Sequence, residues 1–299
     1  MIKLNQVYNM DCIDGMKQIN SCSINLILTD PPYNIGKEFD NDNLSMGDYL
    51  DWCKEWIPEL NRVLKWGGAI FITLGWKYVA EVKNIFNNQK ELRLKNWIIW
   101  YRQDGWKGDK GFAQSYENIL YFIKDNVSEE RINSFREWLN KHRIKKGYSL
   151  SNINNILGWA TTGGGCASGY MGDKEDKQIP SPEHYKKLKE LLSLDDTYDK
   201  LVFEEKYIKF NKVDVCDDLW LTPKSEKKRL GHPTQKPLTL FQRILRTSSE
   251  INDLVLDPFM GSGTTAFACK SLKRNFIGFE IDKEYSDIVN NRMKQECII

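Results

Sequence analysis

The sequence predicts a doubly wound α/β fold, in which a mostly parallel sheet is covered by helices on both faces. Three observations predict it. Short, unbroken apolar runs such as 26–28 and 254–256 are typical of strands buried on both faces. These runs alternate along the chain with segments in which apolar residues recur at helical spacing. The length of 299 residues is enough for one large core that carries a smaller insertion.

The first 125 residues alternate between the two patterns. One apolar stretch ends at an acid at Asp11, and a second ends at Asp30. A longer segment has apolar residues at helical spacing, and Pro58 within it is expected to kink or break a helix. The last two strands of this half can pair antiparallel. We expect strands at 6–11, 25–29, 69–74, 97–101 and 118–123, and helices at 13–19, 48–64 and 78–86.

The composition changes after residue 125, where basic residues become frequent and helical signals dominate. A turn is expected at Gly147, and Ser149 or Ser151 is suited to cap the helix that follows. The arrangement is loosely similar to a helix-turn-helix. We interpret this region as a basic helical insertion that grips the substrate; the alternative is a set of basic residues on a solvated helix face. Helices are expected at 135–143, 151–157 and 183–192.

A glycine-rich stretch from 161 to 182 interrupts the insertion and is expected to be mobile and outside any core. Strands and helices alternate again near the C-terminus, which restores the α/β pattern. There we expect strands at 254–256 and 276–279, and helices at 238–246, 264–272 and 284–293.

Composition excludes several classes of protein. No stretch is long and apolar enough to cross a bilayer, and the first residues do not form a signal peptide. Seven cysteines without a Cys-x-x-Cys pair, and only three histidines, indicate a reduced cytoplasm and no structural metal. The 43 basic and 41 acidic residues leave a net charge of +2, which is too small to identify a nucleic-acid partner.

The stretch Asp30-Pro-Pro-Tyr33 follows the predicted strand at 25–29. Pro31 and Pro32 cannot continue a sheet or a helix, so Asp30 and Tyr33 are expected in a stiff loop at the carboxyl end of a strand. In open α/β sheets, ligands bind at that edge. The alternative is a structural turn in which Asp30 bonds only its own backbone.

A second informative stretch, Asp257-Pro-Phe-Met-Gly-Ser-Gly263, lies between a predicted strand and a predicted helix. Gly261 and Gly263 let the backbone approach a ligand at the start of the helix, and Glu280 follows the next strand, where a ribose-binding acid belongs. The Asp-Pro-Phe insertion spoils a pyrophosphate turn, and no phosphate-binding Gly-Lys-[Ser/Thr] is present. We therefore expect a nucleoside ligand without phosphates, although a nicotinamide-dependent oxidoreductase shares these features.

These two motifs resemble those of the amino-methylating DNA methyltransferases that use S-adenosylmethionine. Their order is similar to that of the circularly permuted beta class, and the segment from His232 to Pro237 matches a further cofactor segment of that class. The resemblance covers roughly residues 5–123 and 207–292. It implies a mostly parallel, seven-stranded methyltransferase sheet in three segments: the catalytic half at 1–125, a target-recognition insertion at 126–206 and the cofactor-binding half at 207–299.

The resemblance also implies roles for single residues. The Asp30 carboxylate and the Pro31 carbonyl would accept the two N–H bonds of an exocyclic amine, and Tyr33 would stack on a flipped base. A cysteine nucleophile after proline, which cytosine carbon-5 methylation needs, does not occur in the sequence. The catalytic set is Asp30, Pro31, Pro32 and Tyr33.

In the cofactor site, Glu280 would hold the ribose hydroxyls, Asp11 and Cys12 the adenine edge, and Lys236 would lie near the methionine carboxylate. Asp11 alone is also compatible with a helix cap, and Lys236 with a surface lysine. We assign His232 a structural role. The full cofactor set is Asp11, Cys12, Asp30, Lys236, Asp257, Phe259, Gly261, Ser262, Gly263 and Glu280.

The first residue of the catalytic motif predicts the target base, because Asp tends to mark adenine N6 and Ser cytosine N4 in this family. N4-cytosine methylation and a non-catalytic DNA-binding regulator remain alternatives. The expected partner is double-stranded DNA, and similar enzymes often dimerise or work with a restriction endonuclease. The insertion would contact DNA through Lys141, Arg143, Lys145 and Lys146.

Overall fold

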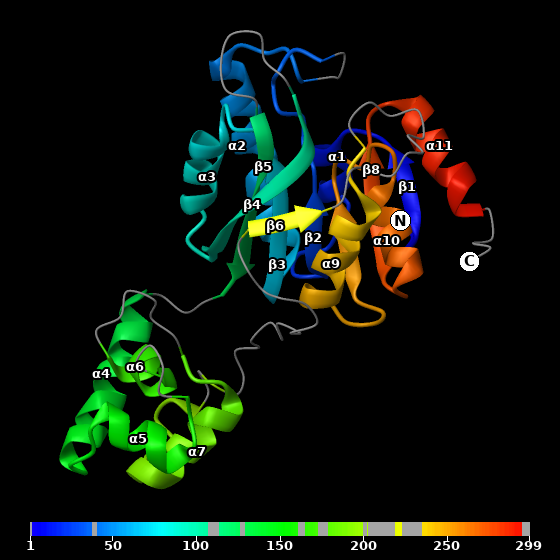
Figure 1. The fold of residues 1–299 in the computed structure, drawn as a ribbon. Helices are drawn as coiled ribbons and strands as arrows, with labels where there is room; N and C mark the ends of the chain where they lie inside the picture. Colours follow the sequence, from blue (N-terminus) through cyan, green and yellow to red (C-terminus); the bar gives the residue numbers. More distant parts are fainter. Residues whose placement is uncertain are drawn as a thin grey trace. The chain divides into compact units, whose positions relative to one another are not determined.

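The structure is a computed structural model that describes residues 2–37, 41–106, 114–125, 129–160, 165–172, 179–199, 202, 219–222 and 235–294. The chain forms two compact units (Figure 1). Unit 1 combines Met1–Asp125 with Ile208–Ile299, and unit 2 is Asn126–Tyr207. Within the described residues, no helix is long and apolar enough to span a membrane.

Unit 1 is built on one sheet, which confirms the predicted doubly wound, mostly parallel α/β fold. Its order within the described residues is β1-β8-β7-β2-β3-β5-β4-β6. Every pairing is parallel except those of β5 with β3 and β4, so the predicted antiparallel pair is present. The eighth strand, β6, is a short edge strand beyond the seven predicted. The strands are β1 Gln6–Asn9, β2 Ile24–Thr29, β3 Leu64–Leu74, β4 Leu92–Trp106, β5 Gln114–Lys124, β6 Leu219–Thr222, β7 Leu254–Asp257 and β8 Asn275–Glu280.

The sheet has a topological switch point between β2 and β7, which lie side by side. Helix α10 (Thr264–Ser271) leads from β7 to β8 on one side, whereas α2 (Met46–Val63) leads from β2 to β3 on the other. The loops after β2 and β7 therefore diverge at the carboxyl ends of adjacent strands. In doubly wound sheets, a crevice at this point is where ligands bind.

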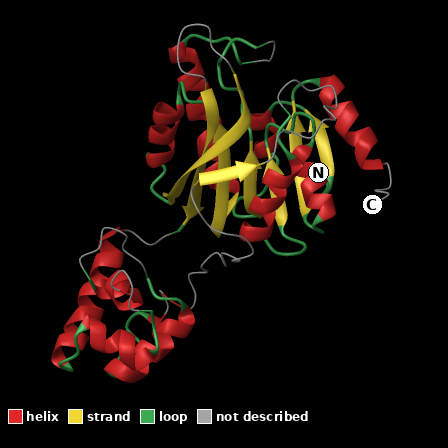
Figure 2. Ribbon diagram, in the orientation of Figure 1, coloured by secondary structure: helices red, strands yellow, loops and turns green. Residues whose placement is uncertain are grey.

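Helices cover both faces of this sheet (Figure 2). Side chains alternate along β2, so Ile27 packs in one core while Leu26 and Leu28 pack in the other. The first core lies against α1 (Cys12–Lys17), α2 and α3 (Val79–Asn87). The second lies against α9 (Leu238–Ser248), α10 and α11 (Lys283–Lys294).

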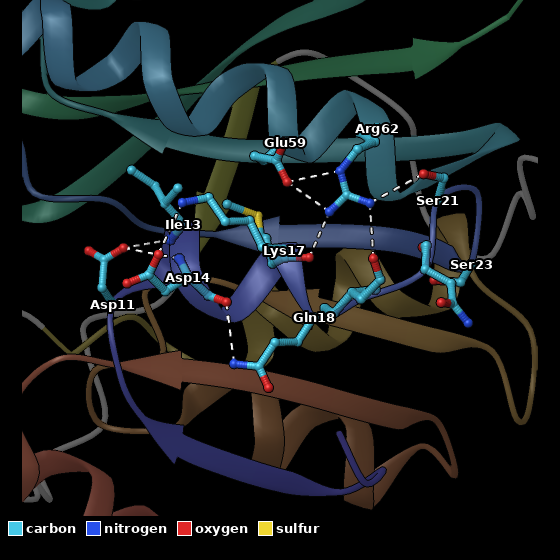
Figure 3. A network of polar contacts seen from close by, with 12 residues as sticks. Asp11, Ile13, Asp14, Lys17, Gln18, Ser21, Ser23, Glu59 and Arg62 are labelled. Atoms are coloured by element: carbon cyan, nitrogen blue, oxygen red, sulfur yellow. Dashed lines mark hydrogen bonds and ion pairs between the residues drawn. The ribbon is translucent and has the colours of Figure 1, made fainter. Parts of the chain in front are cut away.

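Helix α2 runs through Pro58, so the predicted break at this residue is wrong. The helix loses one backbone donor there, but Trp56, Ile57 and Leu60 around it are fully buried in the core. Packing of this face outweighs the local cost of the proline. At the end of the helix, Arg62 pairs with Glu59 and donates to the carbonyls of Met16 in α1 and of Ile19 just after it (Figure 3).

Unit 2 has its own core, formed by α4 (Glu129–Lys145), α5 (Leu150–Leu157), α6 (Gly165–Met171) and α7 (Pro182–Leu192). Ser149 caps α5 in a capping box, one of the two predicted caps. The expectation that 161–182 lies outside any core is wrong for α6, because Ala167, Tyr170 and Met171 are buried. The buried Arg136 donates to two carbonyls at the end of α6 and thereby stabilises this glycine-rich helix.

Candidate active site

The two loops singled out in the sequence meet at the switch point of the sheet. Thr29, the last residue of β2, donates a 2.7 Å hydrogen bond through its hydroxyl to the carboxylate of Asp257, the last residue of β7. Asp30 follows Thr29 directly. The acid–proline–proline–tyrosine loop and the glycine-rich loop therefore start from adjacent strands that are held together by a buried hydrogen bond.

Asp30 is the centre of a polar network. Its Oδ1 accepts hydrogen bonds from the Tyr33 hydroxyl at 2.7 Å and from the Thr73 hydroxyl on β3. Its Oδ2 pairs with the Lys236 ammonium at 2.7 Å. A carboxylate offers about four acceptor positions, two on each oxygen. Oδ1 thus has two donors and Oδ2 has one, so the described residues leave one acceptor position on Oδ2.

A second carboxylate, Glu117 on β5, completes the network. Its Oε2 lies 3.2 Å from the Lys236 ammonium and 3.0 Å from the Tyr33 hydroxyl. The Tyr33 hydroxyl has one proton and contacts both Asp30 and Glu117, so the two acids compete for it. Burial raises the pKa of Tyr33 well above its ordinary value, and the charges of Asp30 and Glu117 raise it further. The phenol is therefore neutral.

Lys236 lies just before α9 and is almost fully buried. Burial lowers the pKa of its ammonium, but the charges of Asp30 and Glu117 more than offset this, so the pKa is raised and the group stays protonated. The ammonium also lies 5.0 Å from the centroid of the Tyr33 ring. Its backbone carbonyl accepts from the hydroxyl of Thr264, the first residue of α10, at 3.3 Å. Lys236 thereby connects α10 to Asp30.

Packing holds the proline loop in place. Pro31 is buried, and the Pro32 carbonyl accepts a 2.9 Å hydrogen bond from the Tyr49 hydroxyl on α2. Asn34 has a left-handed backbone with φ of +55°, and its N–H donates to Asp42. The Tyr33 ring packs against Gly75, where an added Cβ would come within 3.0 Å of the ring. Any larger residue at position 75 would therefore crowd the Tyr33 ring.

The glycine-rich loop has the backbone that its sequence predicts. Gly261 and Gly263 both have positive φ, +49° and +84°. A Cβ on Gly263 would also lie 2.7 Å from Val289 of α11. Glu280, at the end of β8, accepts from the N–H of Gly261 at 2.6 Å and from that of Asp282 at 2.9 Å. A carboxylate has about four acceptor positions, so Glu280 can still accept a hydrogen bond from a ligand hydroxyl.

Asp257 is buried and joins elements of its own unit. It accepts from the hydroxyls of Thr29 and Thr265 and from the backbone N–H of Phe259. Burial raises its pKa to about 7, against the lowering effect of the hydrogen bonds from Thr265 and Thr29. These contacts fit a residue that fixes the loop. Its predicted contact with a cofactor stays a prediction.

The remaining cofactor candidates lie around the same edge. Asp11 is the N-cap of α1 and accepts from Ile13 at 2.8 Å and from Asp14 at 3.3 Å (Figure 3), which is the alternative role that the sequence left open. Its neighbour Cys12 is buried, and burial raises its pKa, so the thiol is uncharged. Phe259 packs edge-on against Trp52 and Trp56 of α2, and Ser262 is buried. His232 lies outside the described residues.

The four basic residues predicted to contact DNA lie in unit 2 and differ in their exposure to solvent and in their hydrogen-bond partners. Lys141 and Lys145 are exposed, one turn apart on α4. Lys146 is exposed and donates to the Ser193 hydroxyl at 2.9 Å. Arg143 is half-buried and donates to Asn140 at 2.7 Å and to the Tyr148 carbonyl at 2.6 Å, so it supports the turn between α4 and α5.

The comparison with known proteins identifies the family. The chain belongs to the DNA methylases, because the family described as DNA methylase matches residues 24–291. It is 32% identical over 288 residues to the Type II methyltransferase M.HpaI of Haemophilus parainfluenzae, an alignment that covers 96% of this chain and 73% of that protein. It is 31% identical over 281 residues to the DNA adenine methyltransferase YhdJ of Escherichia coli K12, covering 92% and 78%. This family membership disfavours the nicotinamide-dependent alternative.

Solved structures share the fold. The crystal structure of the M1.HpyAVI–SAM complex matches with a TM-score of 0.51 at 21% identity and covers 96% of this chain and 98% of that one. The cytosine-N4-specific PvuII DNA methyltransferase matches with a TM-score of 0.60 at 16% identity, covering 98% and 87%. At these identities the likeness shows a common methyltransferase fold.

Glu117 was not among the residues singled out from the sequence. One signal could have found it: an acid immediately precedes the predicted core strand 118–123, whose residues 119–123 are all apolar or aromatic. Buried acids are rare unless they are paired, so such an acid indicates a cation nearby. The partner, Lys236, is 119 positions away in the chain, and only the fold brings the two together.

Proposed function

We propose that this DNA methylase transfers the methyl group of S-adenosylmethionine to the exocyclic N6 of an adenine that is flipped out of double-stranded DNA. The observation that carries the proposal is the Asp30 carboxylate, fixed by three donors with one acceptor position left on Oδ2. An exocyclic amine is a weak nucleophile, because its lone pair is delocalised into the ring. A fixed acceptor for one of its N–H bonds favours the geometry in which nitrogen attacks.

The residues near the glycine-rich loop fit S-adenosylmethionine. Gly261 and Gly263 open the backbone at the start of α10, and the Glu280 carboxylate beside them can accept from ribose hydroxyls. When bound, the cofactor supplies a methyl group on a positively charged sulfur. Asp30 and Glu117 together outweigh Lys236 by one negative charge, which favours a cation at this place.

Asp30 would orient the amine and stabilise the positive charge that grows on its nitrogen, with the Pro31 carbonyl as the second acceptor. The half-buried Tyr33 ring would stack on the base, and its hydroxyl keeps the ring aligned through Asp30 and Glu117. Lys236 would lie between this centre and the cofactor helix. Asp30 thus acts by position and charge, and no covalent intermediate is needed.

We further propose that unit 2 recognises the target DNA, with Lys141 and Lys145 as its exposed cations on α4. The Type II names of relatives such as M.HpaI support a paired restriction endonuclease. A homodimer and a cytoplasmic location are carried forward from the sequence as predictions. Adenine as the target is supported by Asp30 at the first motif position and by the relative YhdJ.

The test is incubation of the protein with DNA and methyl-labelled S-adenosylmethionine, followed by digestion and separation of the nucleosides. We expect the label in N6-methyldeoxyadenosine. Label only in N4-methyldeoxycytidine would overturn the assignment of the base. Tight binding of NAD with no affinity for S-adenosylmethionine would overturn the assignment of the reaction.

A further inference from the structure

We propose that Glu117 is a positioning residue for methyl transfer: it is the counterion that balances Lys236, so that the charge of Asp30 remains available to the reacting amine. This inference rests on the proposed transfer to an exocyclic amine. It assigns a function to a buried acid on a strand that neither sequence motif contains.

The burial of Glu117 calls for an explanation. Its side chain is only 9% exposed, and a carboxylate in such a place is costly unless a cation or hydrogen bonds compensate it. Its Oε2 has both, the Lys236 ammonium at 3.2 Å and the Tyr33 hydroxyl at 3.0 Å. Both partners are also partners of Asp30. Glu117 is therefore connected to Asp30 twice, through a cation and through a phenol.

Charge balance shows what Glu117 changes. With Glu117 present, two carboxylates share one ammonium, and the formal charge of the trio is −1. Without it, the Lys236 ammonium at 2.7 Å would neutralise Asp30 alone. A neutral ion pair is a poorer stabiliser of positive charge on a nearby nitrogen than a net anion is. Lys37 is a further cation in range: burial and Lys236 lower its pKa, whereas Asp42, Glu117 and Asp30 raise it.

Glu117 also affects geometry. It shares the Lys236 ammonium with Asp30 Oδ2, the oxygen that keeps one acceptor position for the substrate. Like Asp30, it contacts the Tyr33 hydroxyl, and the two contacts together fix the ring proposed to stack on the base. Glu117 therefore acts through Lys236 and Tyr33 and need not touch the substrate itself.

This charge balance predicts that two harmful substitutions compensate each other. E117Q leaves the trio with a formal charge of 0, and K236M leaves it with −2 across two carboxylates that repel each other. The double variant E117Q/K236M restores −1 on Asp30. A residue that serves only packing would give the opposite result, because the two losses would add.

The experiment measures single-turnover methylation with saturating DNA and labelled S-adenosylmethionine for the wild type, both single variants and the double variant. We expect E117Q to be about 100-fold slower, the scale for removal of one preorganised electrostatic group, and the double variant to recover at least about tenfold of that loss. E117D keeps the charge and should be faster than E117Q. The matched control is E91Q, because the half-buried Glu91 accepts from Asn61 away from this network and its loss should not change the rate.

Two results would overturn the inference: an E117Q rate equal to that of the wild type, or a double variant as slow as the product of the single effects. Circular dichroism and cofactor affinity accompany each variant. If E117Q fails to fold while the double variant folds and methylates, the pairing is supported; if both fail to fold, Glu117 is a stability residue and the inference is wrong. Transfer of label to cytosine N4 by the wild type would overturn only the base assignment, since that target is also an exocyclic amine.

Discussion

We predict that the buried Asp257 makes the free energy of unfolding depend on pH. Replacing it with Asn keeps the size of the side chain but removes the ionisable group between Thr29, Thr265 and the N–H of Phe259. Burial raises the pKa of Asp257 to about 7 in the folded protein. An aspartate in an unfolded chain has a pKa of about 3.9. The folded protein therefore binds this proton more tightly than the unfolded chain does.

The direction and size of this pH effect follow from the linkage between proton binding and folding. Below about pH 4 the carboxyl is protonated in both states, and its contribution to stability is fully present. Between about pH 4 and 7 the unfolded chain loses the proton first, so the free energy of unfolding falls as the pH rises. At about 1.4 kcal/mol for each pH unit, the distance from about 3.9 to about 7 corresponds to a loss of about 4 kcal/mol.

Urea unfolding of the wild type and of D257N between pH 4.5 and 7.5 gives the difference in the free energy of unfolding between the two proteins at each pH. The change of this difference with pH measures the loss. We expect the wild type to lose most of the 4 kcal/mol, about 1.4 kcal/mol per pH unit, relative to the variant across this range. T265V is the control, because it removes a hydrogen bond that lowers the Asp257 pKa and should extend the fall to higher pH. A wild-type-minus-variant difference that stays constant with pH would refute the reasoning.

The exposed cations of unit 2 and the cap of α1 give two further predictions. Replacing Lys141 and Lys145 with Gln should reduce the slope of the logarithm of DNA affinity against the logarithm of salt concentration, by about 0.9 for each phosphate that the variant no longer neutralises. An unchanged slope would contradict their role. R143Q should instead lower the stability of unit 2 by about 1 kcal/mol, seen in thermal unfolding, because Arg143 supports a turn. D11S keeps a side-chain oxygen that can cap α1, so the stability of the protein should not change. Its affinity for S-adenosylmethionine, measured by calorimetry, should fall about tenfold. An affinity equal to that of the wild type would mean that Asp11 serves only as a helix cap.

Much of the fold is predictable, because most of its strands contain a short apolar run that is followed by an acid or a glycine. Strand β2 is the clearest case, since three consecutive apolar residues need cover on both faces. Helix α6 is not predictable in this way. Gly165 and Gly169 in the helix and both flanking residues in the sequence are glycines, which have low helix propensity. The helix forms because its apolar residues are buried and Arg136 binds carbonyls at its end. Tertiary contacts decide there, as they do at Pro58.

The candidate site is predictable where its chemistry lies within one loop. Asp30 with its two prolines, and Gly261 with Gly263, can be read directly from contiguous sequence. Contacts between segments that are far apart in the sequence cannot be predicted in this way. The ion pairs of Lys236 depend on β2, β5 and the segment before α9 meeting at one edge, and no local pattern specifies which acid a buried lysine will meet. The sequence therefore predicts the anion, the cofactor loop and Lys236 as a member of the site, but not the two acids with which Lys236 pairs.

We propose that Asp30 positions and stabilises the nitrogen that receives the methyl group. The most direct test is the rate of methyl transfer by D30A, together with its affinities for S-adenosylmethionine and for DNA. Lys236 keeps Glu117 as a partner in this variant, so the fold should persist. We expect transfer to fall by about 1,000-fold or more while DNA affinity stays within about threefold. Methylation by D30A at a rate near that of the wild type would contradict the account.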